Sequence, residues 1–153
     1  MNSSTARGLA GGGALISAAS LLMPWYVLRA GDLQDIGRSG IDALGALSPV
    51  VLVLAIVAGW SGSVRIHRLL PAAASAVLTV FVLVKIASPP AVLEALGSTH
   101  GGAVESQLVD GFAAAFAAGM GLHYAPSWGI WVAAIGALAA LVGTIVTAMQ
   151  HRP

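Results

Sequence analysis

The chain has 153 residues, of which 58% are hydrophobic and 8% are charged, and its formal net charge is +1. An average soluble domain has roughly 25% charged residues, so this chain has too little polar surface to cover a water-soluble globule. The small net charge gives no basis for nucleic-acid binding, and the absence of cysteine excludes disulfides, thiolate metal sites and a cysteine nucleophile. We therefore expect residues 1–153 to form a single membrane domain, with the lipid bilayer as its solvent.

Four apolar segments approach the roughly 20 residues needed to cross a hydrocarbon core. They cover residues 8–28, 41–60, 69–87 and 127–149. In lipid the backbone must satisfy its own hydrogen bonds, so a segment of this length and composition predicts a helix. The sequence predicts an all-α integral membrane four-helix bundle. A cleaved signal peptide is the alternative for the first segment, because Arg7 precedes it and small residues surround Ala18.

The charges between these segments predict their orientation. The two connections on one side of the membrane would hold every acidic residue, namely Asp32, Asp35, Asp42, Glu94, Glu105 and Asp110. The other side would hold arginines without acids, namely Arg7, Arg65, Arg68 and Arg152. Basic residues concentrate on the cytoplasmic side, so both termini are expected in the cytoplasm. A single lysine beside six arginines, with abundant alanine and glycine, is typical of a GC-rich bacterial genome, and we expect the membrane to be a bacterial plasma membrane.

Several residues at the ends of the segments carry local signals. Ser39 and Asp42 form a capping-box pattern at the start of the second segment. Pro24 and Pro49 fall within apolar runs, where a missing amide donor predicts a kink. Aromatic and basic residues at segment ends predict anchors at the membrane interface, namely Trp25, Tyr26, Trp60, Trp128, Trp131 and Lys85.

Lys85 is the only basic residue inside a predicted span, and the acidic Asp42 lies at the second position of the span 41–60. A charge in the membrane is by default a functional candidate. Lys85 lies near the end of its segment, however, so its long stem can carry the ammonium group to the interface. We expect it to act as an anchor, and an ion pair with Glu94 or Asp42 is the alternative.

Small residues predict where the helices meet. The last segment repeats them at spacings of four and three, at Gly129, Ala133, Gly136, Ala140 and Gly143. The first segment carries Gly8 and Gly12 in a GxxxG pattern. Such patterns let two helix backbones approach closely, so we expect the first and last helices to pack together. A contact with a second protein through these residues is the alternative.

The longest connection contains a further helical pattern. Apolar residues recur every fourth position at Val104, Leu108, Phe112, Phe116 and Met120. This spacing predicts an amphipathic helix over residues 103–120. It is too short to span the bilayer, so we expect it to lie on the outer leaflet or to cap the bundle.

No residue pattern predicts enzymatic chemistry. His100, His123, Glu94, Glu105 and Asp110 share the long connection, but no pair has the spacing of metal ligands. Serine, histidine and carboxylate residues form no nucleophilic motif. We therefore expect no catalytic residue, cofactor or metal.

The overall layout is similar to that of a known group of proteins. The motifs that carry the similarity are Leu-Leu-Met-Pro-Trp-Tyr at residues 21–26, Ser-Gly-Ile-Asp-Ala-Leu at residues 39–44 and Gly-Ile-Trp at residues 129–131. They resemble a pattern of small four-helix membrane proteins of actinobacteria, and the tryptophan-associated membrane proteins have a similar layout. The resemblance implies a multi-pass plasma-membrane protein and assigns no functional residue.

These features favour a non-enzymatic protein that acts by lateral association in the membrane. It would be an accessory or assembly subunit of a complex, or a homo-oligomer, so its partners would be other membrane subunits or copies of itself. A small transporter or channel is the alternative, and it would need a polar path through the bilayer. Besides Lys85, the polar groups that the spans offer for such a path include the hydroxyls of Ser17, Ser20, Ser75, Thr79, Thr144 and Thr147.

Overall fold

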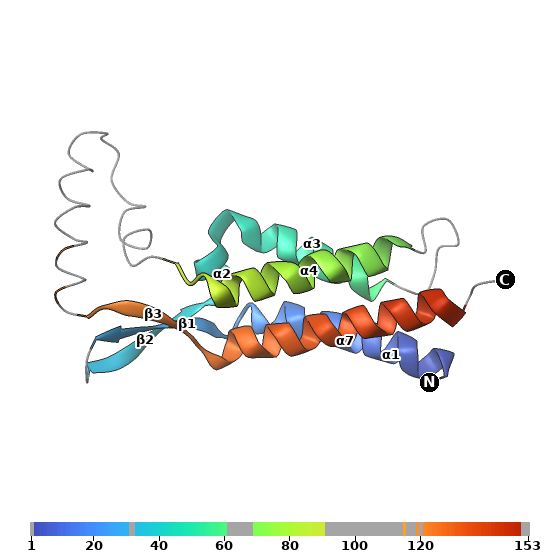
Figure 1. Cartoon of the computed structure of the whole chain (residues 1–153), viewed down its shortest axis with the longest axis horizontal. Coiled ribbons are helices and arrows are strands. Elements are labelled where there is room, and N and C mark those ends of the chain that lie inside the picture. Colours follow the sequence, from blue (N-terminus) through green and yellow to red (C-terminus); the bar gives the residue numbers. More distant parts are fainter. Residues whose placement is uncertain are drawn as a thin grey trace.

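The computed structural model describes residues 2–30, 33–60, 69–90, 115, 119 and 121–150. Its helices are α1 (Ser3–Ser20), α2 (Gly40–Leu44), the 3-10 helix η1 (Gly45–Leu47), α3 (Ser48–Gly59), α4 (Leu69–Ala87) and α7 (Trp128–Gln150), and its strands are β1 (Pro24–Ala30), β2 (Leu33–Ser39) and β3 (His123–Pro126). The long helices form an elongated bundle with the strands at one end, here called the sheet end (Figure 1). The start of α1 and the end of α7 lie at the opposite end, here called the terminal end (Figure 1).

Three stretches of the described chain are long and apolar enough to cross a membrane: Gly40–Gly59, Leu69–Ala87 and Trp128–Gln150. They correspond closely to the predicted segments 41–60, 69–87 and 127–149. Within the first of these stretches, Gly45 has a φ of 50° and closes α2, and Pro49 then occupies the first turn of α3. Proline needs no amide donor in that position, so the predicted kink at Pro49 is a change of helix. The structure is thus mostly helical, and three of its long apolar helices are compatible with a membrane helical bundle.

The predicted first span over residues 8–28 is wrong in its second half. α1 ends at Ser20 and β1 begins at Pro24. The residue before a proline avoids the helical region, and proline itself lacks an amide donor, so the helix stops ahead of it. The following Trp25, Tyr26 and Val27 favour a strand. Pro24 therefore marks a change from helix to strand where a kink was expected.

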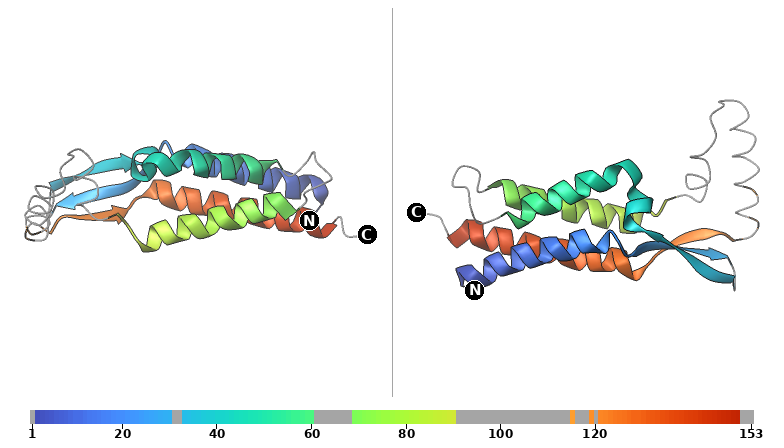
Figure 2. Two further views of the ribbon diagram at one scale, coloured as in Figure 1. Left: turned by 90° about the horizontal axis from the view of Figure 1, so that it is seen from above. Right: turned by 180° about the vertical axis from the view of Figure 1, so that it is seen from behind.

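The strands form an antiparallel sheet in the order β2-β1-β3. β1 and β2 make a hairpin, and β3 pairs with the other edge of β1, with Tyr26 opposite Pro126 and Arg29 opposite His123. α1 continues into β1, and β3 continues into α7, so the two helix–strand units run side by side along the molecule (Figures 1 and 2). The all-α prediction missed this sheet.

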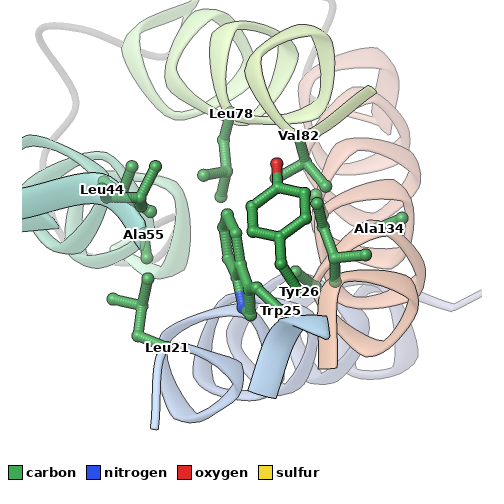
Figure 3. Close-up of a cluster of buried hydrophobic side chains, with 12 residues drawn as sticks. Leu21, Trp25, Tyr26, Leu44, Ala55, Leu78, Val82 and Ala134 are labelled. Carbon is green, nitrogen blue, oxygen red and sulfur yellow. The ribbon is translucent and has the colours of Figure 1, made fainter. Parts of the chain in front are cut away.

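The long helices pack in two neighbouring pairs. α1 lies against α7, and α3 lies against α4, while α3 also contacts α1 and α4 also contacts α7. The two views in Figure 2 show this arrangement. Large buried side chains gather toward the sheet end (Figure 3), and a second cluster of small buried residues contains Ala14, Ala58, Ala74 and Ala140.

One predicted element cannot be compared with the structure. The amphipathic helix over residues 103–120 lies outside the described residues, except for Ala115 and Gly119.

Candidate functional site

The interface between α1 and α7 brings backbone against backbone. A Cβ atom at Gly13 would lie 2.5 Å from both the Gly136 carbonyl oxygen and the Ala140 nitrogen. One at Gly136 would lie 2.7 Å from the Ser17 hydroxyl, and one at Gly143 would meet the Ala10 nitrogen. Real side chains do not tolerate such distances, so these glycines are required for the two helices to approach this closely.

The predicted packing residues divide into two groups. All five on the last helix, Gly129, Ala133, Gly136, Ala140 and Gly143, are buried. Gly8 and Gly12 are different, because a Cβ at either would have no described atom within 4 Å. Among the described residues, the GxxxG pattern of α1 therefore takes no part in the contact with α7.

The α1 residues that are buried instead are Ala6, Ala10, Gly13, Ala14, Ser17 and Ser20, and all of these except Ala14 follow one line along the helix. Their spacing of four and three repeats the spacing of the small residues on α7. This near-heptad pattern, followed on both helices, could have identified the contact face from the sequence.

Hydroxyl groups inside the bundle reinforce the helix contacts. The Ser17 hydroxyl donates to the Ala133 carbonyl at 3.1 Å, which joins α1 to α7. The hydroxyls of Ser75 and Thr144 lie 2.9 Å apart, which joins α4 to α7. Thr79 donates to the Ser75 carbonyl. Among the described residues, no buried side-chain nitrogen or oxygen lacks a hydrogen-bond partner.

At the sheet end, Trp25 and Tyr26 fill the core of the bundle. Their exposed fractions are 0% and 1%. The Trp25 indole nitrogen donates to the Ser20 carbonyl at 2.8 Å, and the Tyr26 hydroxyl donates to the Lys85 carbonyl at 2.7 Å. Figure 3 shows the tyrosine hydroxyl directed toward α4 and the indole nitrogen toward α1. The prediction that these two residues are interfacial anchors is wrong, because the chain turns after α1 and carries both rings between the helices.

Residues 21–26, here called the clasp, also bind the other helices through their backbone. The amides of Gly40 and Ile41 at the start of α2 donate to the carbonyls of Met23 and Leu21, at 3.1 and 3.0 Å. The Ser127 amide, just before α7, donates to the Trp25 carbonyl at 2.8 Å. A Cβ at Gly40 would lie 2.7 Å from the Trp25 indole nitrogen, so this position also requires glycine.

The environment of Tyr26 fixes its protonation state. Burial raises its pKa to about 12, because desolvation disfavours the phenolate. The hydroxyl therefore stays a donor at neutral pH. The Tyr124 ring lies edge-on to the Tyr26 ring, with their centroids 6.5 Å apart.

The remaining predicted anchors are at the bundle surface. Trp60, Trp128 and Trp131 are exposed by 61%, 56% and 52%. Lys85 is half-buried, and its Nζ lies 5.9 Å from the centre of the Phe81 ring. Positions at helix ends with exposed rings suit an interfacial role.

The predicted helix cap is confirmed. The Ser39 hydroxyl accepts from the Asp42 amide at 3.2 Å and donates to the Asp42 carboxylate at 2.6 Å. This cap starts α2 at the point where β2 ends.

Metal-binding side chains do not gather in the part of the chain that the structure describes. No group of three His, Asp or Glu side chains comes together there. His123 is exposed, with Nδ1 2.9 Å from the Gly121 carbonyl oxygen. The other candidate ligands, His100, Glu94, Glu105 and Asp110, lie outside the described residues.

The features that the structure brings together are therefore a close-packed helix pair, a hydrogen-bonded interior and a clasp at the sheet end. Each of them holds helices in place. No protein-family model, curated protein or solved structure matches this chain.

Proposed function

We propose that the chain is a non-enzymatic multi-pass membrane protein that acts by lateral association, as an accessory or assembly subunit of a membrane complex or as a homo-oligomer. One observation carries this proposal. The groups inside the bundle are used to hold the helices together, whereas one face of α1 is rich in glycine, and a Cβ atom added at these glycines would have no described atom within 4 Å.

The outward surfaces of the helices differ. α3, α4 and α7 expose large aliphatic side chains suited to lipid, such as Val53, Val80 and Ile135. Along the first half of α1 the outward positions include Gly8, Gly11 and Gly12, where an added Cβ would have no described atom within 4 Å. Glycine offers lipid chains little side-chain contact but lets another helix approach closely. We therefore assign lateral association to this face of α1.

The bundle interior supports association over transport. A transport path needs polar groups that a solute can contact. The hydroxyls of Ser17, Ser75 and Thr144 are instead bonded to neighbouring helices. Trp25 and Leu78 fill the space between the helices toward the sheet end.

The proposed setting is a bacterial plasma membrane, with α1 as the fourth crossing helix and both termini in the cytoplasm. α1 has 18 residues, or about 27 Å at 1.5 Å per residue. The start of α1 and the end of α7 lie at the same end (Figure 1), which fits two termini on one side. Unpaired strand edges are not tolerated in hydrocarbon, so the sheet would project outside the membrane.

Native purification tests the association. The protein would be extracted in a mild detergent or directly into nanodiscs, and its mass and any co-purifying chains would be measured. We expect an oligomer or a defined complex. A monodisperse monomer without a partner would contradict the proposal.

A pair of matched variants locates the contact. Gly12→Leu should leave the bundle folded, since the site has open space, but should reduce association. Leu15→Ile, on the same helix at a position exposed by 72%, is the volume-matched control. Association that survives Gly12→Leu and Gly8→Leu would show that another face carries it.

Cysteine labelling tests the orientation, because the chain has no cysteine of its own. Ser3 and Ser88 are exposed at the terminal and sheet ends. An impermeant thiol reagent added to intact cells should label a cysteine at Ser88 and leave one at Ser3 unlabelled. The reverse pattern would invert the proposed topology.

A further inference from the structure

The sheet end of α4 is attached differently from that of the other helices. α1 leads into β1 through a short turn, α2 follows β2 directly, and α7 follows β3 directly. α4 ends at Ala87, and the next described strand, β3, begins only at His123. No short connection therefore joins α4 to the sheet, so the position of this end of α4 must depend on non-covalent contacts.

The polar contact between the sheet and α4, among the described residues, is the hydrogen bond from the Tyr26 hydroxyl to the Lys85 carbonyl. Carbonyl groups in the last turn of a helix lack partners within the helix. Lys85 lies in that turn, and strand β1 supplies the missing donor. The bond is partly buried, since Tyr26 is 1% exposed and Lys85 is half-buried.

We propose that Tyr26 is a latch that couples the sheet to the end of α4. β1 holds Tyr26 in place through its pairing with β2 and β3 on both edges. Displacement of β1, for example by a partner that grips the sheet, withdraws the hydroxyl and frees the last turn of α4. The sheet and the end of α4 therefore open together. This coupling does not depend on whether the protein associates laterally.

Hydrogen exchange of the intact protein in nanodiscs tests the latch. The reporter is the Ser88 amide, which donates to the Val84 carbonyl at the end of α4. Tyr26→Phe should raise its exchange rate roughly two- to tenfold, the factor that one net hydrogen bond is worth. Tyr124→Phe is the matched control, because the Tyr124 hydroxyl makes no hydrogen bond within the described residues, and it should leave the rate unchanged.

A second variant tests the coupling itself. Val27→Gly weakens β1 and keeps the Tyr26 hydroxyl that bonds to Lys85. It should raise Ser88 exchange in the natural chain and add nothing in the Tyr26→Phe background, because the latch is already open. Unchanged Ser88 exchange in Tyr26→Phe, or an equal effect of Val27→Gly in both backgrounds, would overturn the proposal.

Discussion

The two helix pairs of this bundle are held together by opposite means. Between α1 and α7, glycines such as Gly13 and Gly136 bring the backbones into contact. Around α3 and α4, large side chains such as Leu78 and Val82 fill the space. Lipid removes the hydrophobic driving force between helices, so contact area and hydrogen bonds must hold them. The α1–α7 contact depends on the absence of side chains, whereas the core around α4 depends on the size of its side chains. The two regions should therefore fail under opposite substitutions.

The largest effect is expected at the α1–α7 interface. Gly136→Leu should abolish the folded bundle, because its Cβ would lie 2.7 Å from the Ser17 hydroxyl and 2.8 Å from the Gly13 carbonyl oxygen. Leu138→Ile is the control, at a position exposed by 46% on the same helix. Thermal unfolding in detergent gives the Tm of both variants. An unchanged Tm in Gly136→Leu would show that the α1–α7 contact does not depend on glycine at this position.

The α3–α4 pair should respond to a loss of volume. Leu78→Ala removes a fully buried side chain, and a cavity of this kind costs about 2–5 kcal/mol of unfolding free energy. Leu83→Ala, at a position of α4 exposed by 48%, should cost far less. Equal losses for the two variants, measured by denaturant unfolding, would show that this pair is not held by side-chain packing.

A smaller effect is expected where the two pairs meet. Ser75→Ala and Thr144→Val each remove one hydroxyl of the pair that joins α4 to α7. Hydrogen bonds between membrane helices average about 0.6 kcal/mol and reach about 1.7 kcal/mol. A double-mutant cycle should therefore give a coupling energy in this range. A coupling energy of zero would mean that the two hydroxyls contribute independently.

The smallest effect is expected at the surface. Lys85→Arg should leave stability and assembly unchanged, and Lys85→Leu should only shift the depth of α4, because the latch uses the Lys85 carbonyl and not its ammonium group. A deletion-strain phenotype restored by Lys85→Arg and not by Lys85→Leu, with normal folding of both, would instead favour the transport alternative.

Local composition was enough to predict much of the architecture. Long apolar segments predicted three of the helices, because an unpaired backbone in lipid leaves no alternative. The Ser39 cap was also predictable, since it involves residues three positions apart. The buried face of α7 followed from the spacing of its small residues.

Tertiary structure decided what depends on distant partners. The segment 8–28 is apolar throughout and predicts a helix, but its end from Pro24 onward belongs to β1, which pairs with β2 and with a strand about 100 residues later in the chain. The face of α1 that is buried depends on how α7 lies against it, which selects Gly13 over Gly8 and Gly12. Trp25 and Tyr26 have the composition of interfacial anchors, and only the turn after Ser20 carries them into the core. The sequence thus determined which segments are apolar enough to leave water. The packing of segments far apart in the chain decided which residues of those segments are buried between helices and so shielded from lipid.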